Sequence, residues 1–81
     1  REFEVLDEFL EKLPDVLAPG GRVAILTFHS GEDRRVKKSF KHFLREGVYR
    51  DIATEPIRPS AEECHANSRA KSAKLRWAIR T

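Results

Sequence analysis

The chain has 81 residues, of which 40% are hydrophobic and 36% are charged, and its formal net charge is +3. These values fit one small folded domain and exclude a disordered tail. The longest aliphatic run, residues 23–26, is far shorter than the roughly 20 apolar residues of a membrane-spanning helix. No signal peptide is visible, and the single cysteine, Cys64, cannot form an internal disulfide, so we expect a cytoplasmic protein.

Charge is distributed unevenly along the chain. Residues 1–20 have a net charge of −4, whereas residues 21–81 have a net charge of +7. Two segments, residues 34–45 and 67–81, contain bases and no acids. This asymmetry indicates a surface for nucleic acid or another polyanion toward the C-terminus, although basic faces are often merely solvated. The lack of methionine, even as an initiator, indicates a piece of a longer protein.

The first elements expected are a helix and a strand. Apolar residues recur at three- and four-residue spacing over residues 3–17, which predicts an amphipathic helix that Pro14 interrupts. A proline and two glycines in residues 18–21 end this helix. The continuous apolar run within residues 22–28 then predicts a strand that is covered on both faces.

A second helix is expected over residues 32–45, with its apolar and basic residues on opposite sides. Ser30 and Asp33 have the spacing of a capping box, so Ser30 is expected to cap this helix. Gly47 is the residue expected to end it.

The second half of the chain predicts a strand over residues 49–57 and a short helix over residues 61–66. Ser60 and Glu63 repeat the capping-box spacing before that helix. Residues 67–72 are expected to form a loop. From Ala73 onward, alternating apolar and mostly basic residues are typical of a strand.

Several kinds of catalytic or metal site are disfavoured. His29, Ser30 and Asp33 lie too close in sequence to converge as a hydrolytic triad, and no nucleophile elbow surrounds the serine. The histidines and Cys64 lack the spacing of a zinc site. His29 nevertheless follows a buried strand, where open α/β sheets bind ligands, or it is simply packed in the turn.

The stretch over residues 67–76 carries the clearest signal for RNA or DNA binding. Its Arg69 and Lys71 can neutralise phosphates, and Asn67 and Ser72 can bond sugar or base edges. The alternative is a basic loop that leads into a strand whose outer face is solvated by Lys74, Arg76 and Arg80.

Three motifs in this order resemble the C-terminal part of the MraW/RsmH family. They are Ala-Pro-Gly-Gly-Arg at 18–22, Phe-His-Ser-Gly-Glu-Asp-Arg at 28–34 with Val-Lys at 36–37, and Asn-Ser-Arg-Ala-Lys-Ser-Ala-Lys-Leu-Arg at 67–76. Members of that family are S-adenosylmethionine-dependent methyltransferases, which modify the N4 amine of a cytidine in small-subunit ribosomal RNA.

The resemblance implies an α/β fold, the C-terminal half of a Rossmann-like class I methyltransferase. Its order would be helix, strand, helix, strand, short helix, strand, with the last strands as an antiparallel hairpin. Residues 1–81 would be the C-terminal portion of one domain, and the half that binds most of the S-adenosylmethionine would precede Arg1. We expect no cofactor-binding residue in this segment.

The resemblance also implies a role for this segment in the base pocket and the RNA surface. The partner would be ribosomal RNA or the small ribosomal subunit, with no membrane and no metal. Two alternatives are a non-catalytic nucleic-acid-binding module and an interaction domain that binds a partner along its acidic first helix. The expected substrate-binding residues are Phe28, His29, Ser30, Asn67, Arg69, Lys71 and Ser72.

Overall fold

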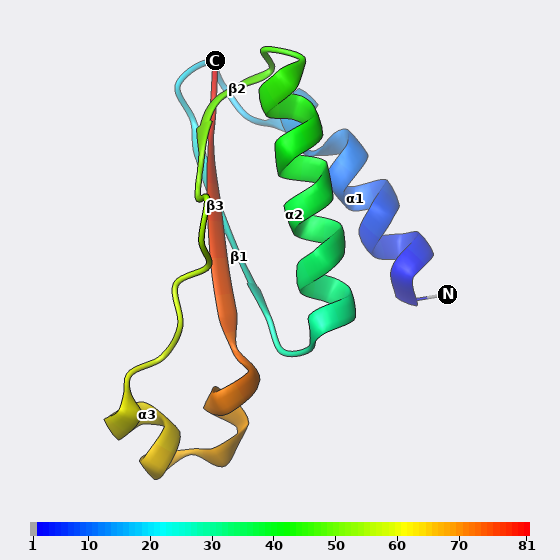
Figure 1. Ribbon diagram of the computed structural model, residues 1–81. Coiled ribbons are helices and arrows are strands. Elements are labelled where there is room, and N and C mark those ends of the chain that lie inside the picture. The colour runs from blue at the N-terminus through cyan, green and yellow to red at the C-terminus, as the bar shows by residue number, and fades with distance from the viewer. Residues whose placement is uncertain (1) are drawn as a thin grey trace.

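A computed structural model describes residues 2–81, and Arg1 lies outside the described residues. The chain alternates helices and strands, as the sequence predicts (Figure 1). The elements are α1 (Glu2–Val16), β1 (Arg22–Thr27), α2 (Ser30–Arg45), β2 (Tyr49–Ile52), α3 (Ala61–Ala66), the 3₁₀-helix η1 (Ser68–Ser72) and β3 (Lys74–Arg80).

The three strands form one sheet in the order β1-β3-β2, and β3 is antiparallel to both neighbours. Thr27 lies opposite Lys74, and Ile52 lies opposite Ala78. The antiparallel pairing predicted for the last two strands is therefore confirmed. Their connection is no tight hairpin turn, because residues 53–73 between them carry α3 and η1.

Both long helices stack on the same side of the sheet. Figure 1 shows α2 lying along one face of the strands, with α1 on the outer side of α2. Leucines of α1, apolar residues of α2 and inward residues of the strands meet in one core. Its buried members are Leu10, Leu13, Val36, Phe40, Tyr49, Ile52 and Ala78.

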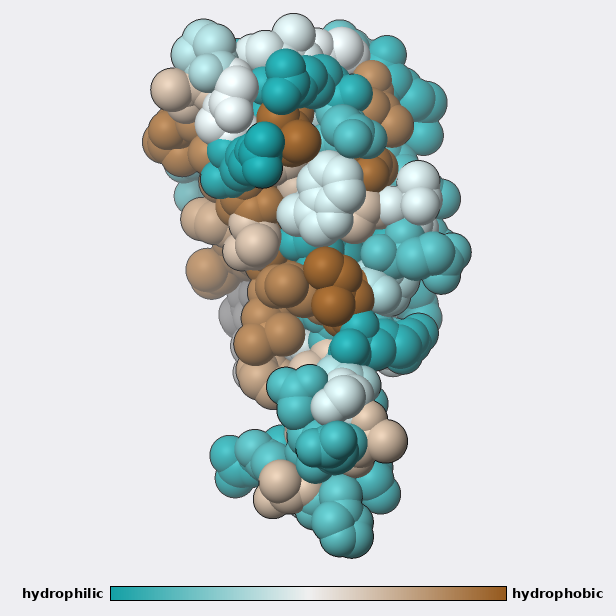
Figure 2. All heavy atoms as spheres, turned by 90° about the vertical axis from the view of Figure 1, so that its left-hand side faces the viewer, coloured by the Kyte–Doolittle hydropathy of each residue, from teal (hydrophilic) through white to brown (hydrophobic). Residues whose placement is uncertain are grey.

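Within residues 2–81 no element covers the opposite face of the sheet, so this part of the chain covers β1 on one face only and does not supply the second cover that the sequence predicts. Residues of β1 alternate between half-buried and exposed, and Leu26 is 53% exposed. Ala24 and Leu26 lie opposite Trp77 and Leu75 of β3. Figure 2 shows the apolar side chains gathered on this face. The sequence shows that residues 23–26 of β1 are apolar, but not what covers them.

Pro14 does not interrupt α1, contrary to the prediction. The helix continues through it to Val16. Proline removes a backbone donor, but here only two helical residues follow it, so little of the helix depends on the lost bond. The Pro14 carbonyl also accepts a hydrogen bond from Arg80 Nε at 3.0 Å, which ties the end of α1 to β3.

The segment after α2 follows the sequence prediction in part. Gly47 ends α2 with a φ of +78°, a left-handed conformation that favours glycine. The strand predicted over residues 49–57 ends at Ile52, and Ile57 makes only an isolated bridge to Leu75. Pro56, which has no backbone N–H to donate, lies in the unpaired stretch between Ala53 and Ile57.

The capping box predicted for α3 is confirmed. Ser60 Oγ accepts a hydrogen bond from Glu63 N, and Glu63 Oε1 accepts one from Ser60 N. The loop predicted over residues 67–72 is instead the 3₁₀-helix η1. Asn67 caps it through a hydrogen bond from Arg69 N to Asn67 Oδ1, a local side-chain bond that organises the turn.

Phe40→Ala tests whether α2 supplies the core. Phe40 is 1% exposed and packs edge-on against Tyr49, so its truncation should lower the free energy of unfolding of the full-length protein by about 3–5 kcal/mol. Leu44→Ala, one turn away at a residue that is 39% exposed, is the control and should cost much less. Equal losses measured by urea unfolding would contradict this placement of the core.

Candidate functional site

The candidate site residues gather near one end of the sheet. The carboxyl end of β1 leads directly into α2, and η1 leads into the start of β3 (Figure 1). Because Thr27 lies opposite Lys74, the first residues after β1 and the last residues of η1 meet at this end. The fold thus brings two of the three sequence motifs together.

His29, and not Ser30, caps α2. His29 has an extended backbone, and its Nδ1 accepts a hydrogen bond from Glu32 N at 3.4 Å. Glu32 Oε1 in turn accepts a bond from Phe28 N at 3.3 Å. The predicted pairing of Ser30 with Asp33 is therefore wrong by one residue, because Ser30 is already in the helix and Asp33 points into the interior.

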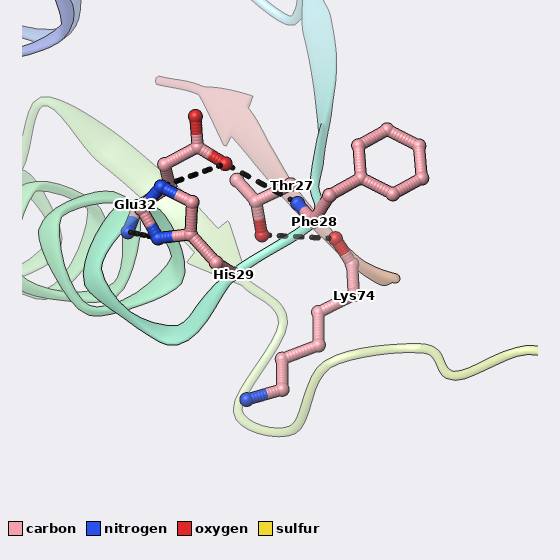
Figure 3. Close-up of polar contacts among 5 residues, drawn as sticks. All are labelled: Thr27, Phe28, His29, Glu32 and Lys74. Atoms are coloured by element: carbon pink, nitrogen blue, oxygen red, sulfur yellow. Dashed lines mark hydrogen bonds and ion pairs between the residues drawn. The ribbon is translucent and has the colours of Figure 1, made fainter. Parts of the chain in front are cut away.

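Phe28 and His29 lie on different sides of the chain. Figure 3 shows their rings pointing away from each other. The imidazole of His29 packs edge-on against Phe3 of α1, with ring centroids 5.8 Å apart. His29 is thus held by its cap hydrogen bond and by its contact with α1. It does not line the hollow next to Phe28.

Phe28 lines an open hollow with Arg69 and Ser72. The hollow has a volume of about 350 Å³, and the Phe28 side chain is 52% exposed there. An exposed aromatic ring can stack on a base, a guanidinium can hold a phosphate or a base edge, and a hydroxyl can donate or accept a hydrogen bond. Three of the seven predicted substrate-binding residues are therefore brought together.

The other predicted site residues are placed differently. Asn67 uses its side-chain oxygen to cap η1, and Lys71 is exposed on the same short helix. Ser30 lines a second hollow, on the side of the sheet that α2 covers, with Lys37 and Lys74 among its neighbours. The sequence prediction thus found the correct end of the sheet but merged two separate surfaces into one.

The strongest polar contact near the site is an ion pair that the sequence analysis missed. Arg76 Nε donates to Asp33 Oδ1 at 2.7 Å and Arg76 Nη2 donates to Asp33 Oδ2 at 3.2 Å. Asp33 is 7% exposed and Arg76 is 5% exposed. Arg76 therefore faces α2 and not solvent. The interpretation of β3 as a strand with Arg76 on its solvent-exposed face is wrong.

The surroundings of Asp33 favour its charged form. The hydrogen bond from Arg76 lowers the pKa of the Asp33 carboxyl below its ordinary value of 3.8. Burial acts in the opposite direction, and the positive charges of Arg76, Lys74 and Lys37 lower the pKa further. The pair is thus a charged, two-bonded link between the first turn of α2 and the central strand.

Two further observations concern residues 2–81 as a whole. They contain no group of three or more His, Cys, Asp and Glu side chains placed to hold a metal ion. Among the described helices, none is long and apolar enough to cross a membrane.

The architecture is that of an α/β protein with a small antiparallel sheet and a polar, partly basic site at one sheet end. A sequence profile of the MraW methylase family matches residues 1–81. The chain belongs to this family.

Similar proteins share most of this chain. It is 75% identical over 79 residues to ribosomal RNA small subunit methyltransferase H 2 of Alkaliphilus metalliredigens, a match that covers 98% of this chain and 23% of that protein. It is 68% identical over 79 residues to methyltransferase H 1 of Lachnoclostridium phytofermentans, covering 98% and 22%. A Cyanothece relative is 53% identical over 81 residues, covering 99% and 26%. The chain spans about a quarter of the length of these curated relatives.

Asp33→Asn tests the buried ion pair. Removing one partner leaves the Arg76 charge buried and uncompensated, which should cost about 3–5 kcal/mol of unfolding free energy. The exposed pair between Asp7 and Arg35 supplies a matched control, because Asp7→Asn should cost less than about 1 kcal/mol. Similar losses for the two variants in thermal or urea unfolding would show that Asp33 is not anchored as described.

The same carboxyl predicts a pH dependence of stability. Because its pKa is lower in the folded state, Asp33 stabilises the fold above pH 3.8, and this contribution is lost as the pH falls through the lower, folded-state pKa. The difference in unfolding free energy between wild type and Asp33→Asn should therefore be largest near neutral pH and shrink below about pH 4. A difference that stays constant from neutral to strongly acid pH would contradict the lowered pKa.

Proposed function

We propose that the protein containing this chain transfers a methyl group from S-adenosylmethionine to the N4 amine of a cytidine in small-subunit ribosomal RNA. Residues 2–81 would supply part of the base pocket and part of the RNA-facing surface. Membership of the MraW methylase family supports this, as do the relatives named ribosomal RNA small subunit methyltransferase H. Such a substrate also agrees with the cytoplasmic location expected from the sequence.

The observation that carries the proposal is the hollow around Phe28. An exocyclic amine within a stacked helix is out of reach, so the target base must leave its stack and gain new contacts. Phe28 offers a half-exposed ring for stacking, and Arg69 and Ser72 offer donors at the rim of the same hollow. This combination of an aromatic face with a few polar groups is typical of sites for unstacked bases.

The turn that leads from β1 into α2 lacks the glycines of a dinucleotide-type cofactor site. Cofactor sites of the dinucleotide type use a glycine-rich turn that follows a strand and opens a helix. In this chain Gly20 and Gly21 precede β1, and the turn from β1 to α2 is filled by Phe28, His29 and Ser30. We therefore assign the donor to residues outside 2–81, where it would supply the activated methyl group.

The contribution of this segment would be positional. Methyl transfer to an amine needs little covalent help from the protein, so holding the base in line and excluding water matter most. Phe28 is well placed for this, because its backbone N–H is bonded to Glu32 and the strand before it is paired with β3. We assign no proton-transfer role to His29, whose Nδ1 accepts the cap hydrogen bond of α2.

The two alternatives account for less of the structure. A nucleic-acid-binding module made of these residues alone would leave the apolar face of Leu26, Leu75 and Trp77 in water. An interaction domain that binds through the acidic side of α1 would compete with contacts already made there, because Asp7 is paired with Arg35 of α2.

Phe28→Ala in the full-length protein should lower kcat/KM for methylation of small-subunit ribosomal RNA by about 5- to 150-fold, the loss expected from one base–aromatic stack. Phe9→Ala is a matched control, because Phe9 is 49% exposed on α1, away from the hollow. The measurement is transfer of a labelled methyl group to small subunits that lack the modification.

Nucleoside analysis of the product then identifies the methylated atom. N4-methylcytidine in the wild-type product, together with a selective loss in Phe28→Ala, is the expected result. Methyl transfer to another atom would refute the N4 assignment, and full activity of Phe28→Ala would remove this segment from the base pocket.

A further inference from the structure

We propose that the hollow between the start of α2, the start of β3 and the loop after β2 binds backbone phosphates of the RNA that flank the target base. This hollow, called here the basic hollow, is lined by Arg34, Lys37, Arg58 and Lys74 together with Ser30 and Glu55. Its volume is about 340 Å³. The inference rests on the proposed RNA substrate and names a second contact surface for it.

The cations of the basic hollow come from three separate parts of the chain. Arg34 and Lys37 lie on α2, Arg58 lies in the loop after β2, and Lys74 begins β3. Within residues 2–81, none of these four side chains forms an ion pair or a side-chain hydrogen bond. Like charges brought together without partners repel one another, so their convergence favours an anion between them.

The acidic residues nearby do not neutralise the basic hollow. Asp33 also lines it, but both Asp33 oxygens accept hydrogen bonds from Arg76, so this pair adds no net charge. Glu55 is the remaining acid of this lining, against the four cations Arg34, Lys37, Arg58 and Lys74. A lining rich in cations, with hydroxyls from Ser30 and Thr54, matches the oxygens of a phosphodiester backbone.

The position of the basic hollow fits a strand of RNA whose base reaches Phe28. Thr27 immediately precedes Phe28 and lies opposite Lys74, and Thr27 Oγ1 donates a hydrogen bond to the Lys74 carbonyl at 3.5 Å. In Figure 3 the Lys74 side chain extends away from the Phe28 ring toward the chain segment that follows β2. The two surfaces therefore lie on opposite sides of one sheet end, where the sugar–phosphate backbone can pass from one to the other.

The test uses the full-length protein and a short single-stranded RNA with the sequence around the methylated site. Affinity is measured by fluorescence anisotropy between about 0.05 and 0.2 M salt, the range in which phosphate contacts dominate the change. The variant Arg34→Gln/Lys37→Gln/Arg58→Gln removes three cations and leaves Lys74, which lies beside the buried pair. The control Lys41→Gln/Arg45→Gln changes bases of α2 that lie beyond the basic hollow.

Each lost phosphate contact should make the slope of log affinity against log salt shallower by about 0.7 for single-stranded RNA. The triple variant should thus lose about two from the slope and bind about 100-fold more weakly near 0.1 M salt. The control should keep the wild-type slope. If the triple variant is unfolded by circular dichroism, Lys37→Gln alone should still flatten the slope by about 0.7.

The outcomes separate this inference from the proposed function. An unchanged slope in the triple variant, or no RNA binding by the wild type, would refute the proposal that the basic hollow binds phosphates. A second outcome is that the wild type binds RNA with the expected slope, the triple variant does not, and no methyl group is transferred to ribosomal RNA. The proposed function is then refuted, and phosphate binding in the basic hollow is supported. If methyl transfer proceeds and the triple variant has the wild-type KM for RNA, phosphate binding in the basic hollow is refuted and the proposed function is kept.

Discussion

The buried ion pair of Asp33 and Arg76 is the contact on which the arrangement of this chain depends. It joins the first turn of α2 to the middle of the central strand, and both of its hydrogen bonds are shielded from water. Two buried charges are stable only when they satisfy each other, so the pair fixes the start of α2 over β3 and not over another strand. The positions of the other residues at this end of the sheet follow from that placement of α2.

The pair also separates the two polar surfaces. On the side of α2, the negative charge of Asp33 is balanced by Arg76, and the other cations around it remain available to an anion. On the other side, Phe28 leaves the end of β1 and meets η1, whose own turn is set by Asn67. A rigid sheet end with one aromatic surface and one basic surface can hold a nucleotide by its base and by its neighbours' phosphates at the same time.

Much of this fold follows from local patterns in the sequence, and the parts that do not are tertiary. The spacing of apolar residues predicts α1 and α2, and Ser60 with Glu63 predicts α3, because these signals lie within one or two turns of chain. Arg76 and Asp33 are 43 residues apart, and each has an ordinary local interpretation, as a wet strand residue and as a helix cap. Their pairing exists only once β3 lies between β1 and β2. The same holds for the candidate site, where the motifs locate Phe28, Arg69 and Ser72 but not the side of the sheet on which each motif residue lies.

The strand order has a consequence for how the chain folds. The central strand, β3, comes after both of its neighbours in the sequence. Arg22 at the start of β1 can therefore pair with Ile79 only after β3 has been synthesised. Until β3 emerges during synthesis, β1 and β2 have no partner between them, and their hydrogen-bonding edges and apolar side chains are open to association with other chains. Long-range antiparallel pairing of this kind is slow and exposed to aggregation. Because β3 is the last of the three strands in the chain, a C-terminal truncation within it removes the middle of the sheet and leaves both β1 and β2 without their common partner.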